Sequence, residues 1–233
     1  MYHNLGQVRP IFVPKTIEIC AMRLNIFENI TTKKPKETEL VRMIGIMKTS
    51  KKLHKLCSKR QKLLASNNKA YADAIKKKRI PAFAPAAFMF DGKGRNNVIG
   101  LTGICFLESD HMDLTKIEET MQKLENDPHV LLALRSVSGD GLHILIKYAF
   151  DGMEIPNYSA MSVDIMNRTY GAVFELLRDR YCQTLGITID KSGSNMERLC
   201  IISYDPNLYC NLLAEPYIFK YEKKIKLHKT NDC

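Results

Sequence analysis

Three apolar runs separated by short polar segments constrain the fold of this chain more than any other feature. The runs are Leu101–Leu107, Val130–Val137 and Leu142–Tyr148. Runs of this length between turn-forming residues are typical of buried strands. A stretch with apolar residues at helical spacing separates the first two, and a small glycine-containing turn joins the second to the third. We therefore predict a strand, a helix and then two antiparallel strands joined by that turn.

A pair of acidic residues follows the first apolar run. Glu108 and Asp110 are separated by a single serine. Because alternate side chains of a strand share a face, both carboxylates are expected to project together from the strand end. Carboxylate oxygens held in this way suit a hard divalent cation. The pair is therefore a candidate metal site.

The small polar turn at residues 138–141 contains two glycines. Its sequence is Ser138-Gly139-Asp140-Gly141, and His143 follows in the next apolar run. Backbone N–H groups in such a turn bind anions well, so the turn and His143 suit a phosphate-bearing ligand next to a metal. A lone histidine in a strand usually has only a structural role, but the glycine turn before this one favours a binding role.

A second helix and a last strand are predicted after the three runs. The helix spans about residues 159–184, with an apolar face at Met161, Ile165, Val173, Phe174, Leu177 and Tyr181, and Gly186 is its expected C-cap. An apolar segment then leads to Asp190, and Arg198–Ser203 is predicted as a strand. The order strand, helix, strand, strand, helix, strand is the split βαβ pattern of antiparallel ferredoxin-like sheets. The predicted class is α+β.

The N-terminal third is predicted to be mainly helical. A strand is expected at Ile17–Leu24, and a polar connector then leads to Thr38, the expected N-cap of a helix. The apolar face of that helix is Leu40, Val41, Ile44 and Met47. Two more helices are expected, interrupted at residues 66–68 and ending at Arg79. The proline-containing segment 80–85 cannot be helix interior. Asp113 is the expected N-cap of the helix that follows the acid pair.

Positive charge is concentrated in one segment. The chain has a net charge of +10, yet residues 33–79 hold 16 Lys/Arg against 3 acids, whereas the rest of the chain has a net charge of −3. Such asymmetry indicates a surface for a polyanion, most simply nucleic acid. The alternative is a solvated helical face without a partner. Lys93 and Arg95, in a later glycine turn, either reach a phosphate or only decorate a hairpin.

The remaining bulk properties exclude several classes of protein. No apolar run approaches the roughly 18 residues that cross a bilayer, and the first residues lack a signal-peptide pattern. The seven cysteines include no CxxC pair. These features predict a protein of the reducing cytoplasm with no structural zinc site and no membrane association.

In the order and spacing of these motifs, the chain resembles the archaeo-eukaryotic-type primases, or primase–polymerases. The resemblance spans roughly residues 71–211. The family's acid pair corresponds to Glu108-Ser109-Asp110, its small turn and histidine to Ser138–His143, and its third acid to Asp190. The similar branch is found on bacterial plasmids, phages and mobile elements, where the domain often precedes a helicase related to virulence-associated protein E.

The resemblance implies an RRM-like catalytic core at 80–215, with a basic strand and helix region at 1–79 and a basic tail at 216–233. It implies that Mg²⁺ or Mn²⁺ is held by three acidic side chains and that a nucleoside triphosphate is bound nearby. The implied metal ligands are Glu108, Asp110 and Asp190. The implied nucleotide-binding residues are Ser138, Gly139, Gly141, His143 and Arg198. The implied activity is primer synthesis or extension on single-stranded DNA, which the basic region 33–79 would bind.

Several alternatives remain open at this point. Asp190 either binds metal or caps the loop that follows it, and Arg198 either contacts the nucleotide or pairs with Asp190 or Glu197. The family usually has Asp where this chain has Glu108, so metal spacing is looser and Mn²⁺ is favoured, or catalysis is lost and the domain only binds nucleic acid. A nuclease is a weaker option. No Walker-type loop is present, so any helicase is a separate protein or region.

Overall fold

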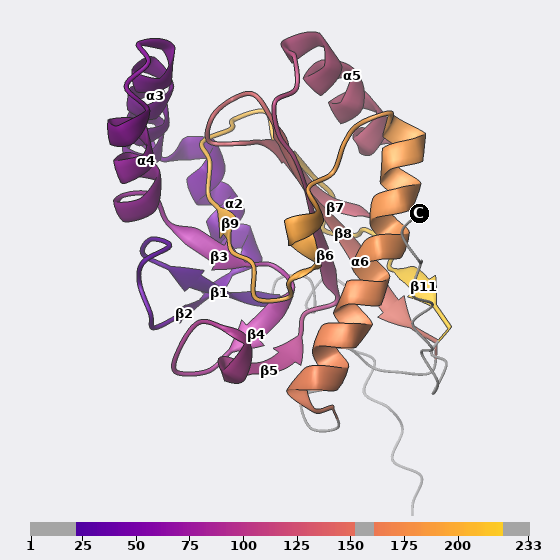
Figure 1. The fold of residues 1–233 in the computed structure, drawn as a ribbon. Coiled ribbons are helices and arrows are strands. Elements are labelled where there is room, and N and C mark those ends of the chain that lie inside the picture. The colour runs from indigo at the N-terminus through magenta and orange to yellow at the C-terminus, as the bar shows by residue number, and fades with distance from the viewer. Residues whose placement is uncertain (1–21, 152–160, 221–233) are drawn as a thin grey trace, which may run out of the picture.

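A computed structural model describes residues 22–151 and 161–220, and in this part of the chain the fold is α+β (Figure 1). The largest sheet contains β6 (Ile104–Ser109), β7 (Val130–Arg135), β8 (Leu142–Phe150), β10 (Tyr209–Cys210) and β11 (Tyr217–Phe219). Its order is β10-β7-β8-β11, and β6 pairs with β8. All pairs are antiparallel except β8 with β11. The predicted α+β class and the antiparallel pairing of the second and third runs are confirmed.

The predicted first strand is two strands. β5 (Val98–Leu101) pairs with β4 (Ala87–Met89) in a small separate sheet, and only β6 belongs to the large one. Gly103 has a φ of 78°, which interrupts the extended conformation between the two strands. The hydroxyl of Thr102 donates to the carbonyl of Pro85 at 2.5 Å and holds this bend.

A second sheet of four strands lies beside the first and includes β1 (Arg23–Phe27), β2 (Lys36–Glu39), β3 (Ala82–Ala84) and β9 (Cys200–Ile201). Its order is β2-β1-β3-β9. The strand expected at residues 17–24 falls mostly outside the described residues. The strand predicted at 198–203 is reduced to β9, and it pairs with β3 rather than with the large sheet. That part of the predicted sheet order is wrong.

Three helices follow β2, namely α2 (Leu40–Thr49), α3 (Lys51–Ala65) and α4 (Lys69–Lys78). Thr38 is not an N-cap, because it lies inside β2 and pairs with Leu24 of β1. The predicted apolar face of α2 is wrong in part, because Val41 is 41% exposed while Met43 is buried. The predicted interruption is confirmed by Asn67, whose positive φ breaks the helix between α3 and α4.

Two helices cover the large sheet from one side. α5 (Leu114–Glu125) begins at Asp113, whose side chain accepts from the backbone of Lys116 at 2.7 Å, so the predicted cap is confirmed. α6 (Val163–Leu185) ends at Gly186 in the left-handed conformation, also as predicted. The predicted start of this helix falls outside the described residues. Ile165 is exposed rather than buried, because it lies on the side of α6 away from the sheet.

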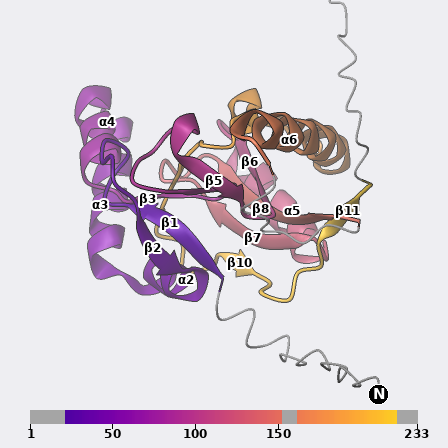
Figure 2. The ribbon, with the colours of Figure 1, turned by 90° about the horizontal axis from the view of Figure 1, so that it is seen from below.

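The large sheet is buried on both faces. Cys105 and Leu107 of β6 belong to a core that includes α5 and α6, whereas Ile104 and Phe106 belong to a second core with α2–α4 and the second sheet. Figures 1 and 2 show α6 on one side of the molecule and α3 and α4 on the other. Burial of both faces explains why the strands read as continuous apolar runs rather than alternating ones. Glu108, two residues beyond Phe106, faces the same side as α2–α4.

The predicted C-terminal tail is in part a strand. The stretch assigned to a basic tail begins with β11, which pairs with Tyr148–Phe150 of β8, and residues 221–233 lie outside the description. Within residues 22–151 and 161–220, no helix combines the length and apolar character needed to cross a membrane.

Candidate active site

The carboxylate of Glu108 stands at the centre of a polar cluster at the end of β6. Glu108 is the direct cross-strand partner of His143 on β8, and His143 Nε2 lies 3.4 Å from Glu108 Oε1. The other carboxylate oxygen accepts two hydrogen bonds from Arg198, one from Nη2 at 2.5 Å and one from Nε at 3.2 Å. Only 12% of the Glu108 side chain is exposed. The structure therefore brings Glu108 and His143 into direct contact.

Charge compensation keeps this buried pair ionised. Burial raises the pKa of Glu108, but His143 and Arg198 reverse that effect and lower it to about 2. Burial lowers the pKa of His143, whereas Cys200 and Glu108 raise it well above the ordinary value of 6.5. His143 Nδ1 lies 3.3 Å from Cys200 Sγ, so both ring nitrogens face protein groups. At neutral pH this site holds an imidazolium and a carboxylate.

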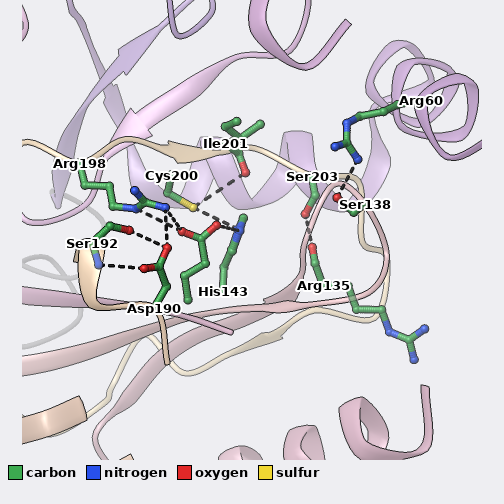
Figure 3. A network of polar contacts seen from close by, with 11 residues as sticks. Arg60, Arg135, Ser138, His143, Asp190, Ser192, Arg198, Cys200, Ile201 and Ser203 are labelled. Atoms are coloured by element: carbon green, nitrogen blue, oxygen red, sulfur yellow. Dashed lines mark hydrogen bonds and ion pairs between the residues drawn. The ribbon is translucent and has the colours of Figure 1, made fainter. Parts of the chain in front are cut away.

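Arg198 also joins Asp190 to the cluster (Figure 3). Arg198 Nη2 lies 3.4 Å from Asp190 Oδ2, and the backbone N–H of Asp190 donates to the carbonyl of Glu108 at 2.8 Å. Asp190 therefore does converge on Glu108 from a distant part of the chain. It also caps the 3₁₀ turn at Lys191–Ser194, accepting from the backbone and hydroxyl of Ser192. The capping role left open for Asp190 is therefore present, Arg198 forms the alternative ion pair, and the metal role of Asp190 stays a prediction.

Asp110 lies just beyond β6 and is more exposed than Glu108, although its carboxyl is partly buried. Burial of its carboxyl and the nearby charge of Glu108 raise its pKa. Asp110 and Glu108 line the same cleft, but Asp190 is not among the residues that line it. Within the described parts of the chain, no three His, Cys, Asp or Glu side chains are grouped so that they could hold a metal ion.

The glycine turn packs directly against the acid pair. The N–H of Ser136 donates to the carbonyl of Gly141 at 2.8 Å, and that of Gly139 donates to the carbonyl of Ser136 at 2.9 Å. Gly139 has a φ of 88°, which favours glycine. A Cβ on Gly141 would lie 2.5 Å from the carbonyl of Ser109 and 3.0 Å from Asp110 Oδ1. A glycine at position 141 is therefore required for the turn to lie this close to the acids.

Arg60 of α3 is a site residue that the sequence analysis did not single out. It is only 4% exposed, and its NH1 group donates to Ser138 Oγ at 2.7 Å (Figure 3). The sequence did not distinguish it from the other 15 Lys/Arg residues of the basic segment 33–79. One signal does distinguish it, because it follows Leu53 and Cys57 at i+7 and i+3, on the buried stripe of α3. A charged residue on an apolar stripe is unusual unless it has a buried partner.

A cleft of about 690 Å³ connects these groups with the basic helices. Its lining combines the acid pair, His143 and Arg198 with α4, the glycine turn and the loop after β4. The lining residues are Ile30, Asp73, Lys76, Lys77, Lys93, Gly94, Glu108, Asp110, Ser136, Val137, Ser138, His143, Glu197, Arg198, Leu199 and Ile201. Lys93 is therefore at the cleft, where it also donates to the carbonyl of Ile30, whereas Arg95 pairs with Asp164 at 2.6 Å.

A family model described as BT4734-like, N-terminal domain, matches residues 75–210, which is more than half of the chain. The chain belongs to this family. The BT4734-like segment runs from within α4 to β10 and contains Glu108, His143, Asp190 and Arg198, whereas Arg60 lies outside it. Neither a curated protein nor a solved structure matches the chain.

Proposed function

We propose that the cleft carries out nucleotidyl transfer of the primase–polymerase type, making or extending primers on single-stranded DNA for a plasmid, phage or mobile element. The observation that supports this most is the meeting of Glu108, Asp110 and His143 on neighbouring strands at a cleft that basic side chains also line. Acids beside cationic and glycine-rich phosphate sites are what nucleotidyl transfer requires. In the cell, such a protein would act in the cytoplasm, beside a separate helicase.

The topology supports an RRM-like core. β6, α5, β7 and β8 follow the split βαβ order, with β8 between β6 and β7. The segment after α6 is not a strand of this sheet, but it runs beside β6 and donates one backbone hydrogen bond from Asp190 to Glu108. This is the position that a fourth strand would occupy in such a core.

The donor set at the cleft fits Mg²⁺ or Mn²⁺ in its chemistry. The low pKa of Glu108 supplies an ionised carboxylate at neutral pH, and Asp110 offers a second one that is exposed to solvent. Glu108 and Asp110 would hold the ion after Arg198 releases the carboxylates of Glu108 and Asp190. When bound, the metal would activate the primer 3′-hydroxyl and stabilise the leaving pyrophosphate.

The protein's own side chains have separate tasks in this proposal. The imidazolium of His143 orients Glu108 from the neighbouring strand. Arg198, once released from the two acids, is a bidentate donor for a phosphate. Ser138 and the N–H groups around Gly139 and Gly141 lie beside the same ligand, and the basic region 33–79 binds the template strand.

Primer synthesis with labelled nucleotides tests the proposal. The wild type should give a product that requires Mg²⁺ or Mn²⁺, with Mn²⁺ the better ion because its geometry is less strict than that of Mg²⁺. Asp110→Ala should abolish the product, whereas Glu119→Ala, an exposed acid on α5, should not. Product formation that is unchanged in Asp110→Ala would exclude the proposed site.

A catalytically inactive nucleic-acid-binding domain is the second candidate. Arg198 occupies oxygens of both Glu108 and Asp190, and the described residues include no group of three metal-binding side chains. A site closed in this way favours a binding role. Retention of single-stranded DNA without product, with either metal and in both the wild type and Asp110→Ala, would support this candidate over the first.

A further inference from the structure

Part of the cleft is lined by polar residues where α4 meets the glycine turn. Lys76 and Lys77 of α4 line it, together with Ser136, Val137 and Ser138. These residues come from segments about sixty positions apart in the chain. The function proposed above includes Lys76 and Lys77 only as part of the basic region 33–79, and it gives Ser136 no role.

Ser136 is the most informative residue of this part of the lining. It is only 5% exposed, it lines the cleft, and its hydroxyl has no hydrogen-bond partner among the residues that the structure describes. A buried hydroxyl without a partner is costly and uncommon in native proteins. Its position at a cleft indicates that a ligand supplies the missing partner.

The charges around Ser136 favour an anionic ligand. In the described residues neither Lys76 nor Lys77 forms an ion pair, although Lys76 is close enough to Asp110 to lower its pKa against the larger effect of burial. Asp73, one helical turn earlier, lines the same cleft and is the carboxylate nearest to them in sequence. Lys76 and Lys77 thus bring two ammonium groups to the cleft, where Asp73 and Asp110 are nearby carboxylates but form no ion pair with them within the described residues.

Arg60 adds a third cation behind the turn. Its NH1 group holds Ser138 at 2.7 Å, and its Nε is buried without a partner in the described part of the chain. Its charge lies in the interior beside Asp73 and Asp140, which act on it electrostatically. A buried guanidinium thus fixes the turn, and the unpartnered hydroxyl of Ser136 and the two lysines of α4 lie in the same cleft lining.

We propose that Lys76, Lys77 and Ser136 form a phosphate-binding subsite that receives a phosphate group of a single nucleic-acid strand or of a free nucleotide. The identity of the ligand rests on the proposed function, but binding itself requires no transfer reaction. Lysine ammonium groups serve as point charges for the phosphate, and the serine hydroxyl donates to a phosphate oxygen. The subsite belongs to the same cleft as Glu108 and Asp110.

Fluorescence anisotropy with a labelled oligothymidylate, in EDTA so that no transfer occurs, tests the subsite. Lys76→Gln/Lys77→Gln should weaken binding by about tenfold or more and reduce the slope of log affinity against log salt by about 0.7, the value for one lost phosphate contact on a single strand. The matched control is Lys51→Gln/Lys52→Gln, which removes the same charge from an exposed part of α3. Equal losses in the two double variants would overturn the proposal, because they would indicate only diffuse attraction.

Ser136→Ala separates a ligand contact from a structural role. The hydroxyl has no protein partner to lose, so the variant should unfold at the same or a higher urea concentration while binding severalfold more weakly. Unchanged binding would overturn the assignment of Ser136.

Inorganic triphosphate distinguishes the two sources of phosphate. If triphosphate competes with the oligonucleotide for the wild type but not for Lys76→Gln/Lys77→Gln, the subsite binds nucleotide phosphates. A lysine effect on the oligonucleotide alone assigns it to the strand backbone. If neither ligand responds to the variant, the subsite is excluded, whatever the outcome of the primer-synthesis assay.

Discussion

The two faces of the large sheet are buried to similar depth but bury different chemistry. On the face covered by α6, the side chains of β6 and β8 are apolar and pack against Phe174 and its neighbours. On the opposite face, Phe106 and Leu145 are equally buried, but the next positions along the strands are Glu108 and His143. The same strands thus build a core without charged side chains on one side, whereas on the other side the core ends at the charged pair Glu108 and His143.

This difference separates stability from function. Apolar burial contributes stability without specific geometry, whereas a buried carboxylate is tolerated only when cations and hydrogen bonds compensate for its lost hydration. Glu108 has both, from His143 and Arg198. We infer that the α6 face mainly holds the fold together and that the face toward α2–α4 holds the site. Five predictions test this division, from the largest expected effect to the smallest.

Phe174→Ala should have the largest effect on stability. Phe174 is fully buried, and a Cβ on Gly193 would lie 2.5 Å from its ring, so the loop that carries Asp190 also packs on it. We expect a loss of about 4 kcal/mol in the free energy of unfolding, measured with urea. Leu176→Ala, at an exposed position on the same helix, should cost far less. The folded Phe174→Ala protein should retain affinity for single-stranded DNA.

Glu108→Gln should destabilise the protein by about 3 kcal/mol at pH 7. The substitution keeps the size of the side chain but leaves the cations of His143 and Arg198 without their shared carboxylate. Urea unfolding of the two proteins measures the difference. A loss well below 1 kcal/mol would show that the ion pairs contribute little, and the contrast between the two faces would then be one of shape alone.

The stability difference between wild type and Glu108→Gln should depend on pH. The folded-state pKa of Glu108 lies below its ordinary value, at about 2, so the stabilisation is fully present above about pH 4.5 and is lost as the pH falls toward 2. We expect the difference to increase slightly from pH 7 to 5, because, against the effect of burial, Glu108 raises the folded-state pKa of His143 above its ordinary value of 6.5, and then to shrink between pH 4.5 and 2. A difference that is unchanged down to pH 2.5 would contradict the pairing.

Gly141→Ala should cost about 2 kcal/mol and displace the acid pair. The new Cβ would lie 2.5 Å from the carbonyl of Ser109, so the turn or the strand end has to move. Gly171→Ala in α6 is the matched control, because its Cβ meets nothing within 4 Å and alanine favours helix. Thermal unfolding should show opposite shifts for the two variants, and a neutral Gly141→Ala would show that the turn is not tightly packed.

Arg95→Ala should have the smallest effect, below about 1 kcal/mol. Its ion pair with Asp164 joins the β4–β5 loop to α6 but is largely exposed to solvent. Binding of single-stranded DNA should be nearly unchanged, because the pair does not line the cleft. A marked loss of DNA affinity would place this loop in the binding surface and would contradict the assignment of binding to the α2–α4 face alone.

The parts of the fold that local patterns specify were predictable. Apolar runs gave β7 and β8 and their pairing, and the capping residues Asp113 and Gly186 gave the start of α5 and the end of α6. The break at Gly103 and the placement of Thr38 inside a strand were not predictable. Both depend on pairing with distant segments, Pro85 in one case and Leu24 in the other.

The candidate site shows the same limit. The motifs predicted that Glu108 and His143 meet, because two adjacent strands and a tight turn fix their register. They did not predict that Arg198 holds Glu108, since its partner depends on how a long loop returns to the sheet. They also missed Arg60, whose role depends on the packing of α3 against the turn. The metal, nucleotide and DNA assignments stay predictions.

The second core has a practical consequence for anyone who wishes to shorten this protein. Leu24, Leu40 and Met43 share it with Phe106 and Leu145, and β1 pairs with β3. A fragment that starts at residue 80 would therefore expose part of one side of its central sheet, lose Lys76 and Lys77, and tend to aggregate. The N-terminal helices are better regarded as half of the folding unit than as an appendage that can be cut away.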